Sequence, residues 1–113
     1  MDLASERCEA CRPGAPTVPE AEEAALLVEI PGWTIVELRD VKRLRRTVRV
    51  DGWEPAVAFA NDVARLATEA DHHPRIVIEW GKVTVDWWTH AIGGLHRNDF
   101  VMAARVNKLT SPG

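Results

Sequence analysis

A glycine-containing turn between two short β-like runs constrains the fold of this chain more than any other feature. Residues 76–80 read Ile-Val-Ile-Glu-Trp, Gly81-Lys82 follow, and residues 83–87 read Val-Thr-Val-Asp-Trp. Runs rich in β-branched and aromatic residues on both sides of a tight turn predict an antiparallel hairpin. In such a hairpin, residues whose numbers sum to about 162 lie opposite each other. The chain must therefore fold around a sheet.

The segment ahead of this hairpin carries the strongest helical pattern. Its apolar residues recur three and four positions apart, as they do on one face of a helix. These residues are Ala56, Phe59, Ala60, Val63, Leu66, Ala67 and Ala70. His73 precedes Pro74, which favours extended backbone at the histidine, so the helix should end by about Asp71.

The remaining elements complete a repeating order. Weaker patterns predict helices over residues 20–30 and 97–109 and strands over residues 33–38 and 44–50. In the second strand, apolar and basic side chains alternate, so one face of the sheet should meet water or a partner. The order α-β-β-α-β-β-α predicts an α+β fold. We expect a single domain, with three helices packed on one face of a four-stranded antiparallel sheet.

Domain boundaries follow from composition. Residues 1–19 contain Pro13, Pro16 and Pro19 but no apolar periodicity, so we expect a flexible N-terminal arm. Residues 20–110 should form the folded domain. At 113 residues with a net charge of −3, the chain has the size for one core. It has no membrane-spanning apolar run and no signal-peptide pattern, so we expect a cytoplasmic protein with reduced cysteines and no membrane partner.

A basic run at residues 42–49 raises the alternative of nucleic-acid binding. Five of these eight residues are Lys or Arg. However, the net charge of the chain is negative, and no aromatic residue interleaves with the basic ones. We therefore expect a solvated or interfacial strand face and no nucleic-acid partner.

Three of the four histidines lie beside the predicted hairpin. On the expected register His72 faces His90 and His73 faces Thr89, and a shift by one residue would keep the histidines neighbours. Because imidazole titrates near neutral pH, such a cluster predicts a site for proton transfer.

Other interpretations of these residues stay open at this point. A His-His pair before a proline is often only a polar loop. Three histidines with Asp99 could also bind zinc, which accepts imidazole and carboxylate ligands. Cys8 and Cys11 have the spacing of half a zinc knuckle, but the chain has no second cysteine pair, so a simple tail is the default interpretation.

A family resemblance rests on motifs around these histidines. They are Asp-His-His-Pro at residues 71–74, Thr89-His90, Gly94-Leu95 and Asp99, together with Gly32-Trp33. The chain from about residue 31 to residue 109 resembles the pterin-4a-carbinolamine dehydratases. Residues 80–85 and the Cys-Glu-Ala-Cys arm resemble the bacterial members. One departure is His96, where the family often has Ser or Thr. Histidine is a poorer helix cap, so the last helix should begin less firmly.

The resemblance implies both a reaction and a set of site residues. The reaction removes water from 4a-hydroxytetrahydropterin to give quinonoid dihydropterin, which recycles the cofactor of aromatic amino acid hydroxylases such as phenylalanine hydroxylase. Pterin is the substrate, and no metal or bound coenzyme is implied. The implied catalytic residues are His72, His73 and His90. The implied supporting residues are Asp99, Pro74, Thr89 and Trp33, the last as a ring-stacking wall.

The resemblance also implies partners. The family commonly forms homodimers and homotetramers, and an open four-stranded sheet has unpaired edges that could join copies. Some members act instead as coactivators that stabilise an oligomeric regulatory protein. That second function would not need the histidines, which this chain keeps.

Overall fold

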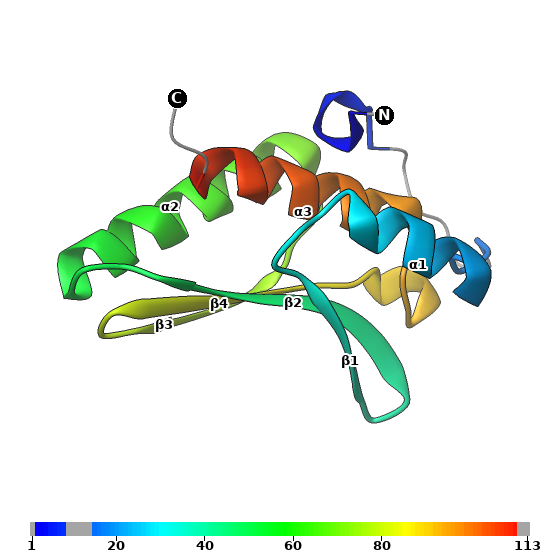
Figure 1. Ribbon diagram of the computed structural model, residues 1–113, viewed down its shortest axis with the longest axis horizontal. Helices are drawn as coiled ribbons and strands as arrows, with labels where there is room; N and C mark the ends of the chain where they lie inside the picture. Colours follow the sequence, from blue (N-terminus) through cyan, green and yellow to red (C-terminus); the bar gives the residue numbers. More distant parts are fainter. Residues whose placement is uncertain (1, 9–14, 111–113) are drawn as a thin grey trace.

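The computed structural model describes residues 2–8 and 15–110 of the chain. Its main elements follow the predicted order, and the expectation of an α+β fold is confirmed (Figure 1). The elements are η1 (Leu3–Ser5), α1 (Glu20–Val28), β1 (Thr34–Leu38), β2 (Val41–Arg49), α2 (Trp53–Ala70), β3 (Arg75–Glu79), β4 (Lys82–Trp87), η2 (His90–Ile92) and α3 (Arg97–Thr110).

The four strands form one antiparallel sheet in the order β1-β2-β4-β3. The register of the hairpin differs by one position from the expected one. Ile76 pairs with Val85 and Glu79 with Lys82, so paired numbers sum to 161. The reason is the turn, which consists of Trp80 and Gly81 and leaves Lys82 in the strand. Gly81 has φ 78°, a left-handed conformation that suits glycine.

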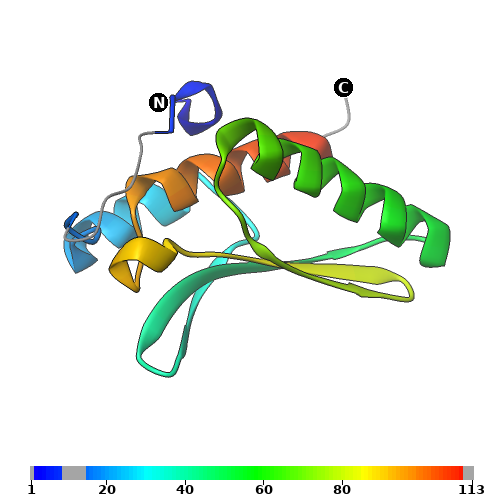
Figure 2. The ribbon, with the colours of Figure 1, turned by 180° about the vertical axis from the view of Figure 1, so that it is seen from behind.

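The helices cover one face of the sheet and leave the other open. Figures 1 and 2 show α1, α2 and α3 on the same side of the strands. The core between these layers contains the fully buried Leu44, Val83, Val85 and Trp87 of the sheet, which face Phe100 and other side chains of α3. The described residues include no helix with the length and apolar character needed to cross a membrane.

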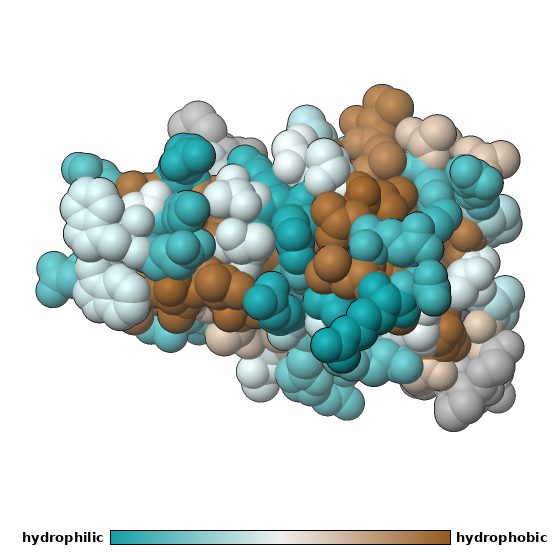
Figure 3. Space-filling model, turned by 90° about the horizontal axis from the view of Figure 1, so that it is seen from below, coloured by the Kyte–Doolittle hydropathy of each residue, from teal (hydrophilic) through white to brown (hydrophobic). Residues whose placement is uncertain are grey.

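The open face of the sheet is polar at its centre. Arg45 pairs with Asp86, and Asp86 pairs with Arg75 across the neighbouring strand, so these three side chains lie on the same face. Leu44 and Trp87, one position along, form a pair on the helix-covered face. Figure 3 shows the open face from below, with hydrophilic side chains across its centre. The alternation expected for the basic strand is therefore present in β2.

The N-terminal segment differs from the expected flexible arm, because residues 2–8 pack against α3. Leu3 is 2% exposed and belongs to the core. The Arg97 guanidinium donates to both carboxylate oxygens of Glu6 at 2.7 and 2.9 Å. Arg105 donates to the backbone oxygens of Ala4 and Glu6. These anchors lie far away in the sequence, so no local pattern could indicate them.

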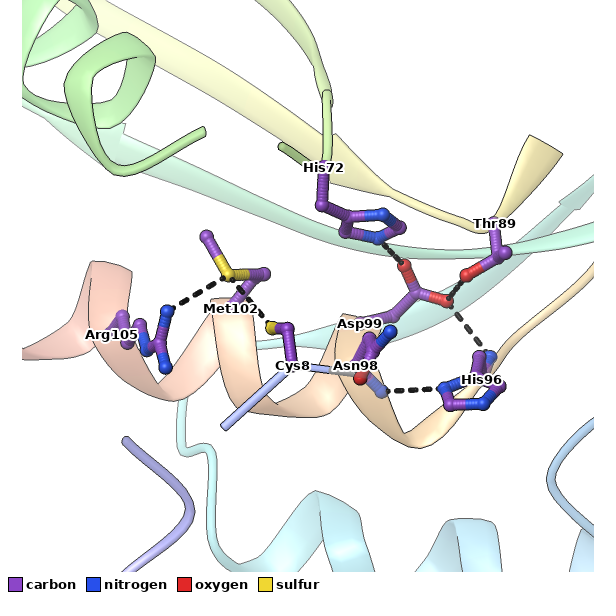
Figure 4. Close-up of polar contacts among 8 residues, drawn as sticks. All are labelled: Cys8, His72, Thr89, His96, Asn98, Asp99, Met102 and Arg105. Carbon is purple, nitrogen blue, oxygen red and sulfur yellow. Dashed lines mark hydrogen bonds and ion pairs between the residues drawn. The ribbon is translucent and has the colours of Figure 1, made fainter. Parts of the chain in front are cut away.

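Two further features belong to this segment. The Cys8 thiol lies 3.6 Å from the sulfur of Met102 on α3 (Figure 4), whereas Cys11 falls outside the described residues.

Hydrogen bonds from Arg97 lower the pKa of Glu6. A carboxyl group with a lowered folded-state pKa stabilises the fold above its unfolded pKa, and this contribution is lost as the pH falls through the lowered value. Acid should therefore weaken the docking of residues 2–8.

Candidate active site

The C-terminal end of α2 fixes the backbone of His72. Asp71 adopts a left-handed conformation with φ 51°, and the His72 N–H donates to the Ala67 carbonyl at 3.1 Å. This arrangement closes the last helical turn. Pro74 then directs the chain into β3, because proline fixes its own φ and favours extended backbone at the residue before it. The histidine pair thus lies in the short connection between a helix end and an edge strand.

His72, Thr89 and Asp99 are joined by hydrogen bonds (Figure 4). Nε2 of His72 lies 2.6 Å from one oxygen of the Asp99 carboxylate, and the Thr89 hydroxyl donates to the other oxygen at 2.9 Å. Asp99 is fully buried, and the His72 side chain is 12% exposed. Because an ionised carboxylate only accepts hydrogen bonds, the hydrogen in the first contact belongs to His72 Nε2. Nδ1 of His72 is then left to exchange a proton.

The start of α3 holds Asp99 in place. Its carboxylate accepts the backbone N–H of His96 at 2.9 Å, while Nδ1 of His96 accepts the backbone N–H of Asn98 at 3.0 Å. This reciprocal arrangement resembles a capping box, and the helix N-terminus favours the negative charge of Asp99. His96 therefore takes the place of the usual cap hydroxyl, because an unprotonated imidazole nitrogen can accept a hydrogen bond.

Trp87 supports His72 from the core side. The two rings are stacked, with centroids 5.6 Å apart and planes 7° from parallel, and Trp87 is fully buried. The indole Nε1 has no hydrogen-bond partner among the described residues. The alternation of β4 could have shown that Trp87 and Trp88 point to opposite faces.

His73 and His90 are exposed to solvent at the same end of the sheet. His73 is 68% exposed on its side chain, and its Nε2 lies 4.0 Å from the carboxylate of Asp71. His90 begins η2, which the Thr89–Gly94 bridge closes, and its ring lies 4.5 Å from that of Trp88. The observed hairpin register, continued past Arg75, sets His72 opposite Thr89 and His73 opposite Trp88. The expected pairing of His72 with His90 is thus shifted by one residue.

Two supporting residues have different surroundings. Pro74 is half-buried between His73 and the start of β3. Trp33 is 5% exposed and donates from Nε1 to the side-chain oxygen of Asn107 at 2.8 Å. Asn107 is two helical turns beyond Asp99, about 12 Å along α3. The hydrogen bond of Trp33 therefore goes to α3 two turns away from Asp99, whereas His72 and Thr89 bind Asp99 itself.

The arrangement provides groups for proton transfer of two kinds. His72 is held by a buried carboxylate, which can stabilise an imidazolium and fix the ring orientation. His73 and His90 are exposed imidazoles that a ligand could reach. The described residues contain no cluster of three or more His, Cys, Asp or Glu side chains suited to a metal ion. The chemistry this geometry suits is general acid and base catalysis.

Comparison with known proteins now places the chain in a family. A family model described as pterin 4 alpha carbinolamine dehydratase matches residues 16–109. A relative from Saccharophagus degradans is 52% identical over 108 residues, which are 96% of each chain, and one from Gloeobacter violaceus is 50% identical over 98% of this chain and 96% of its own. Both carry the provisional name pterin-4-alpha-carbinolamine dehydratase.

A solved structure shares the fold. The crystal structure of a transcriptional coactivator/pterin dehydratase from Brucella melitensis has a TM-score of 0.76 and 24% sequence identity, and the match covers 85% of this chain and 100% of that chain. At this identity the likeness concerns the fold alone. The family model and the relatives at about 50% identity carry the assignment: the chain belongs to the pterin 4 alpha carbinolamine dehydratase family.

Proposed function

We propose that this protein removes water from 4a-hydroxytetrahydropterin and releases quinonoid dihydropterin. His72, His73 and His90 are the catalytic residues of the proposal, and Asp99, Thr89 and Pro74 support them. The observation that carries it is the buried Asp99 carboxylate, which binds His72 at 2.6 Å beside two exposed histidines. The product would return to the cofactor pool of an aromatic amino acid hydroxylase. The hydroxylase we propose first is phenylalanine hydroxylase.

The reaction needs two proton transfers. An acid delivers a proton to the 4a-hydroxyl group, the C4a–O bond breaks, and water leaves. A base takes the N5 proton, and the electron pair of the N–H bond forms the C4a=N5 double bond. Each well-placed transfer contributes typically about 10²–10⁴-fold to the rate. The proposal therefore requires no resident metal or coenzyme, since imidazole groups supply both steps.

The direct test is turnover of freshly made 4a-hydroxytetrahydropterin. We expect the purified protein to accelerate its decay at neutral pH, measured as the appearance of quinonoid dihydropterin by absorbance, with the uncatalysed rate subtracted. The rate should survive exhaustive treatment with a chelator. Loss of activity that added zinc restores would contradict the metal-free mechanism, and no acceleration at all would reject the proposed function.

Removing the ring beneath His72 should impair turnover without unfolding the protein. We expect Trp87→Leu to lower kcat about tenfold, because His72 loses the stacked ring that fixes its plane. Trp87→Phe keeps an aromatic face and should recover most of the rate. We expect the ring current of Trp87 to shift the His72 ring proton resonances upfield, and these resonances should move toward ordinary positions only in the leucine variant. Equal kcat values for the two variants would show that Trp87 contributes only to core packing and does not position His72.

A second candidate function is binding without catalysis. The Brucella protein favours it, because that protein is described as a transcriptional coactivator as well as a pterin dehydratase and shares this fold. On this second proposal the chain stabilises an oligomeric regulatory protein. Loss of pterin dehydration in histidine variants would favour the enzyme. Histidine variants that still support the regulatory protein in cells would favour the coactivator.

Assembly and location complete the proposal. We propose a homodimer or homotetramer in the cytoplasm, because β1 and β3 are the outer strands of an open sheet and offer unpaired backbone groups. Light scattering at micromolar concentration should give a mass of two or four chains. A strictly monomeric mass would contradict this part of the proposal.

A further inference from the structure

Three arginines surround a single carboxylate on the open face of the sheet. Arg45 donates to both oxygens of Asp86 at 2.7 and 2.8 Å, and a guanidinium nitrogen of Arg43 and one of Arg75 each lie 3.6 Å from the same carboxylate. Asp86 is fully buried beneath them. One negative charge therefore faces three positive ones, in a chain whose net charge is −3. Such a surplus is repulsive unless a further anion neutralises it.

This cluster, which we call the Arg43/Arg45/Arg75 cluster, adjoins the candidate active site. Arg75 follows Pro74 directly, at the point where β3 begins. The guanidinium carbon of Arg43 lies 3.9 Å from the centroid of the Trp88 ring, and the Trp88 ring contacts that of His90. His73 lies two residues before Arg75 in the chain. The exposed histidines and the arginines thus lie at the same end of the sheet, with His90 joined to Arg43 through Trp88.

The arginines retain hydrogen-bonding capacity. Nε of Arg43 is buried and has no hydrogen-bond partner among the described residues. The contacts of Arg43 and Arg75 with Asp86, at 3.6 Å, are longer than a hydrogen bond, so most of their N–H groups are not satisfied by it. The side chain of Arg75 is 51% exposed and that of Arg43 is 18% exposed. A carboxylate or phosphate group is the partner whose geometry matches a guanidinium fork.

We infer that the Arg43/Arg45/Arg75 cluster selects pterins whose side chain at C6 carries a carboxylate or a phosphate. The inference rests on the proposed function and names the substrate class for the same site. The pterin ring is neutral near pH 7 and gives these arginines no charge to bind. An anionic substituent reaching from a ring held near His73 and His90 would meet Arg75 and Arg43. For partly exposed groups, the expected gain in affinity is about tenfold.

Three stable ligands test this selection. They are 7,8-dihydroneopterin, which is neutral, its phosphate monoester, and 7,8-dihydrofolate, whose glutamate carries carboxylates. We expect titration calorimetry in low salt to show about tenfold tighter binding of at least one anionic ligand, with the advantage falling as salt is raised. The phosphate and carboxylate arms show which anion is preferred. Equal dissociation constants for all three ligands would overturn the inference.

Charge-removing variants test which residues carry the preference. Arg75→Gln and Arg43→Gln should each shrink the ratio of anionic to neutral affinity severalfold. Arg75→Gln is the safer variant, since its side chain is more exposed. The matched control is Arg65→Gln, an exposed arginine of α2 that pairs with Asp62, and it should leave the ratio unchanged. If the ratio of anionic to neutral affinity were unchanged in both Arg75→Gln and Arg43→Gln, the cluster would not be the source of the selectivity.

The two proposals fail separately. Turnover of a neutral 4a-hydroxytetrahydropterin by the unaltered protein supports the dehydratase function whatever the ligand preference. If turnover occurs and the three ligands bind equally, only the selection by arginines is rejected. If an anionic ligand binds preferentially and no pterin is turned over, only the dehydratase function is rejected, and the cluster remains a binding site for anionic pterins.

Discussion

The variant His72→Ala is expected to lower the turnover number for 4a-hydroxytetrahydropterin by about 10²-fold or more. This is the loss expected for one positioned proton-transfer group. His72 is the histidine with the most constrained ring, since Asp99 binds its Nε2 and Trp87 stacks against its face. The measurement is kcat and KM from initial rates, with the uncatalysed dehydration subtracted. Because the proposed role of His72 is catalytic, kcat should fall much more than KM rises.

A second histidine provides the matched control for this variant. His96 lies three residues before Asp99, but its side chain accepts a hydrogen bond from the Asn98 backbone instead of facing the other histidines. His96→Ala should cost about 1 kcal/mol of stability, as for a lost helix cap, and leave kcat within a factor of two or three. His73→Ala should resemble His72→Ala. If His96→Ala proved as damaging to kcat as His72→Ala, the site would be centred at the start of α3 instead.

The sequence predicted the topology because the signals that set it are local. Apolar spacing over residues 56–70 and the β-branched and aromatic run over residues 83–87 depend only on neighbouring residues, and they form α2 and β4. The hairpin register was missed by one residue for an equally local reason. The turn could consist of Trp80 and Gly81 or of Gly81 and Lys82, and these alternatives shift the strand pairing by one residue. The position of the glycine is compatible with both.

The contacts that shape the site were not predictable in the same way. The stacking of Trp87 on His72 joins a strand to a helix end, and the exposure of His90 depends on η2 and the Thr89–Gly94 bridge. Trp33 was assigned to the site on a motif, but its indole is buried and donates to Asn107, two helical turns beyond Asp99. Long-range packing decides such positions, and a single sequence carries no direct record of it.

Asp99→Ala is expected to lower the free energy of unfolding by about 3 kcal/mol. The carboxylate is fully buried and accepts hydrogen bonds from His72, Thr89 and the His96 backbone. Removing it leaves these donors without their acceptor, and each buried donor that stays unpaired costs about 1–3 kcal/mol. The threonine hydroxyl can rotate and the imidazole can change tautomer. The total loss of stability should therefore be smaller than the sum of three fully unpaired donors. For a domain of this size, the melting temperature should fall by roughly 10 °C.

Two further variants separate the charge from the packing at this position. Asp99→Asn keeps the volume and one acceptor oxygen but directs an amide donor toward groups that are themselves donors, so it should lose about 1–2 kcal/mol. Asp62→Ala removes an exposed carboxylate that pairs with Arg65 on α2, and it should change stability by less than about 0.5 kcal/mol. Chemical denaturation of the three variants provides the comparison. If Asp99→Ala were as stable as Asp62→Ala, the buried carboxylate would be dispensable for the fold. The retention of Asp99 would then have to be attributed to its hold on the His72 imidazole alone.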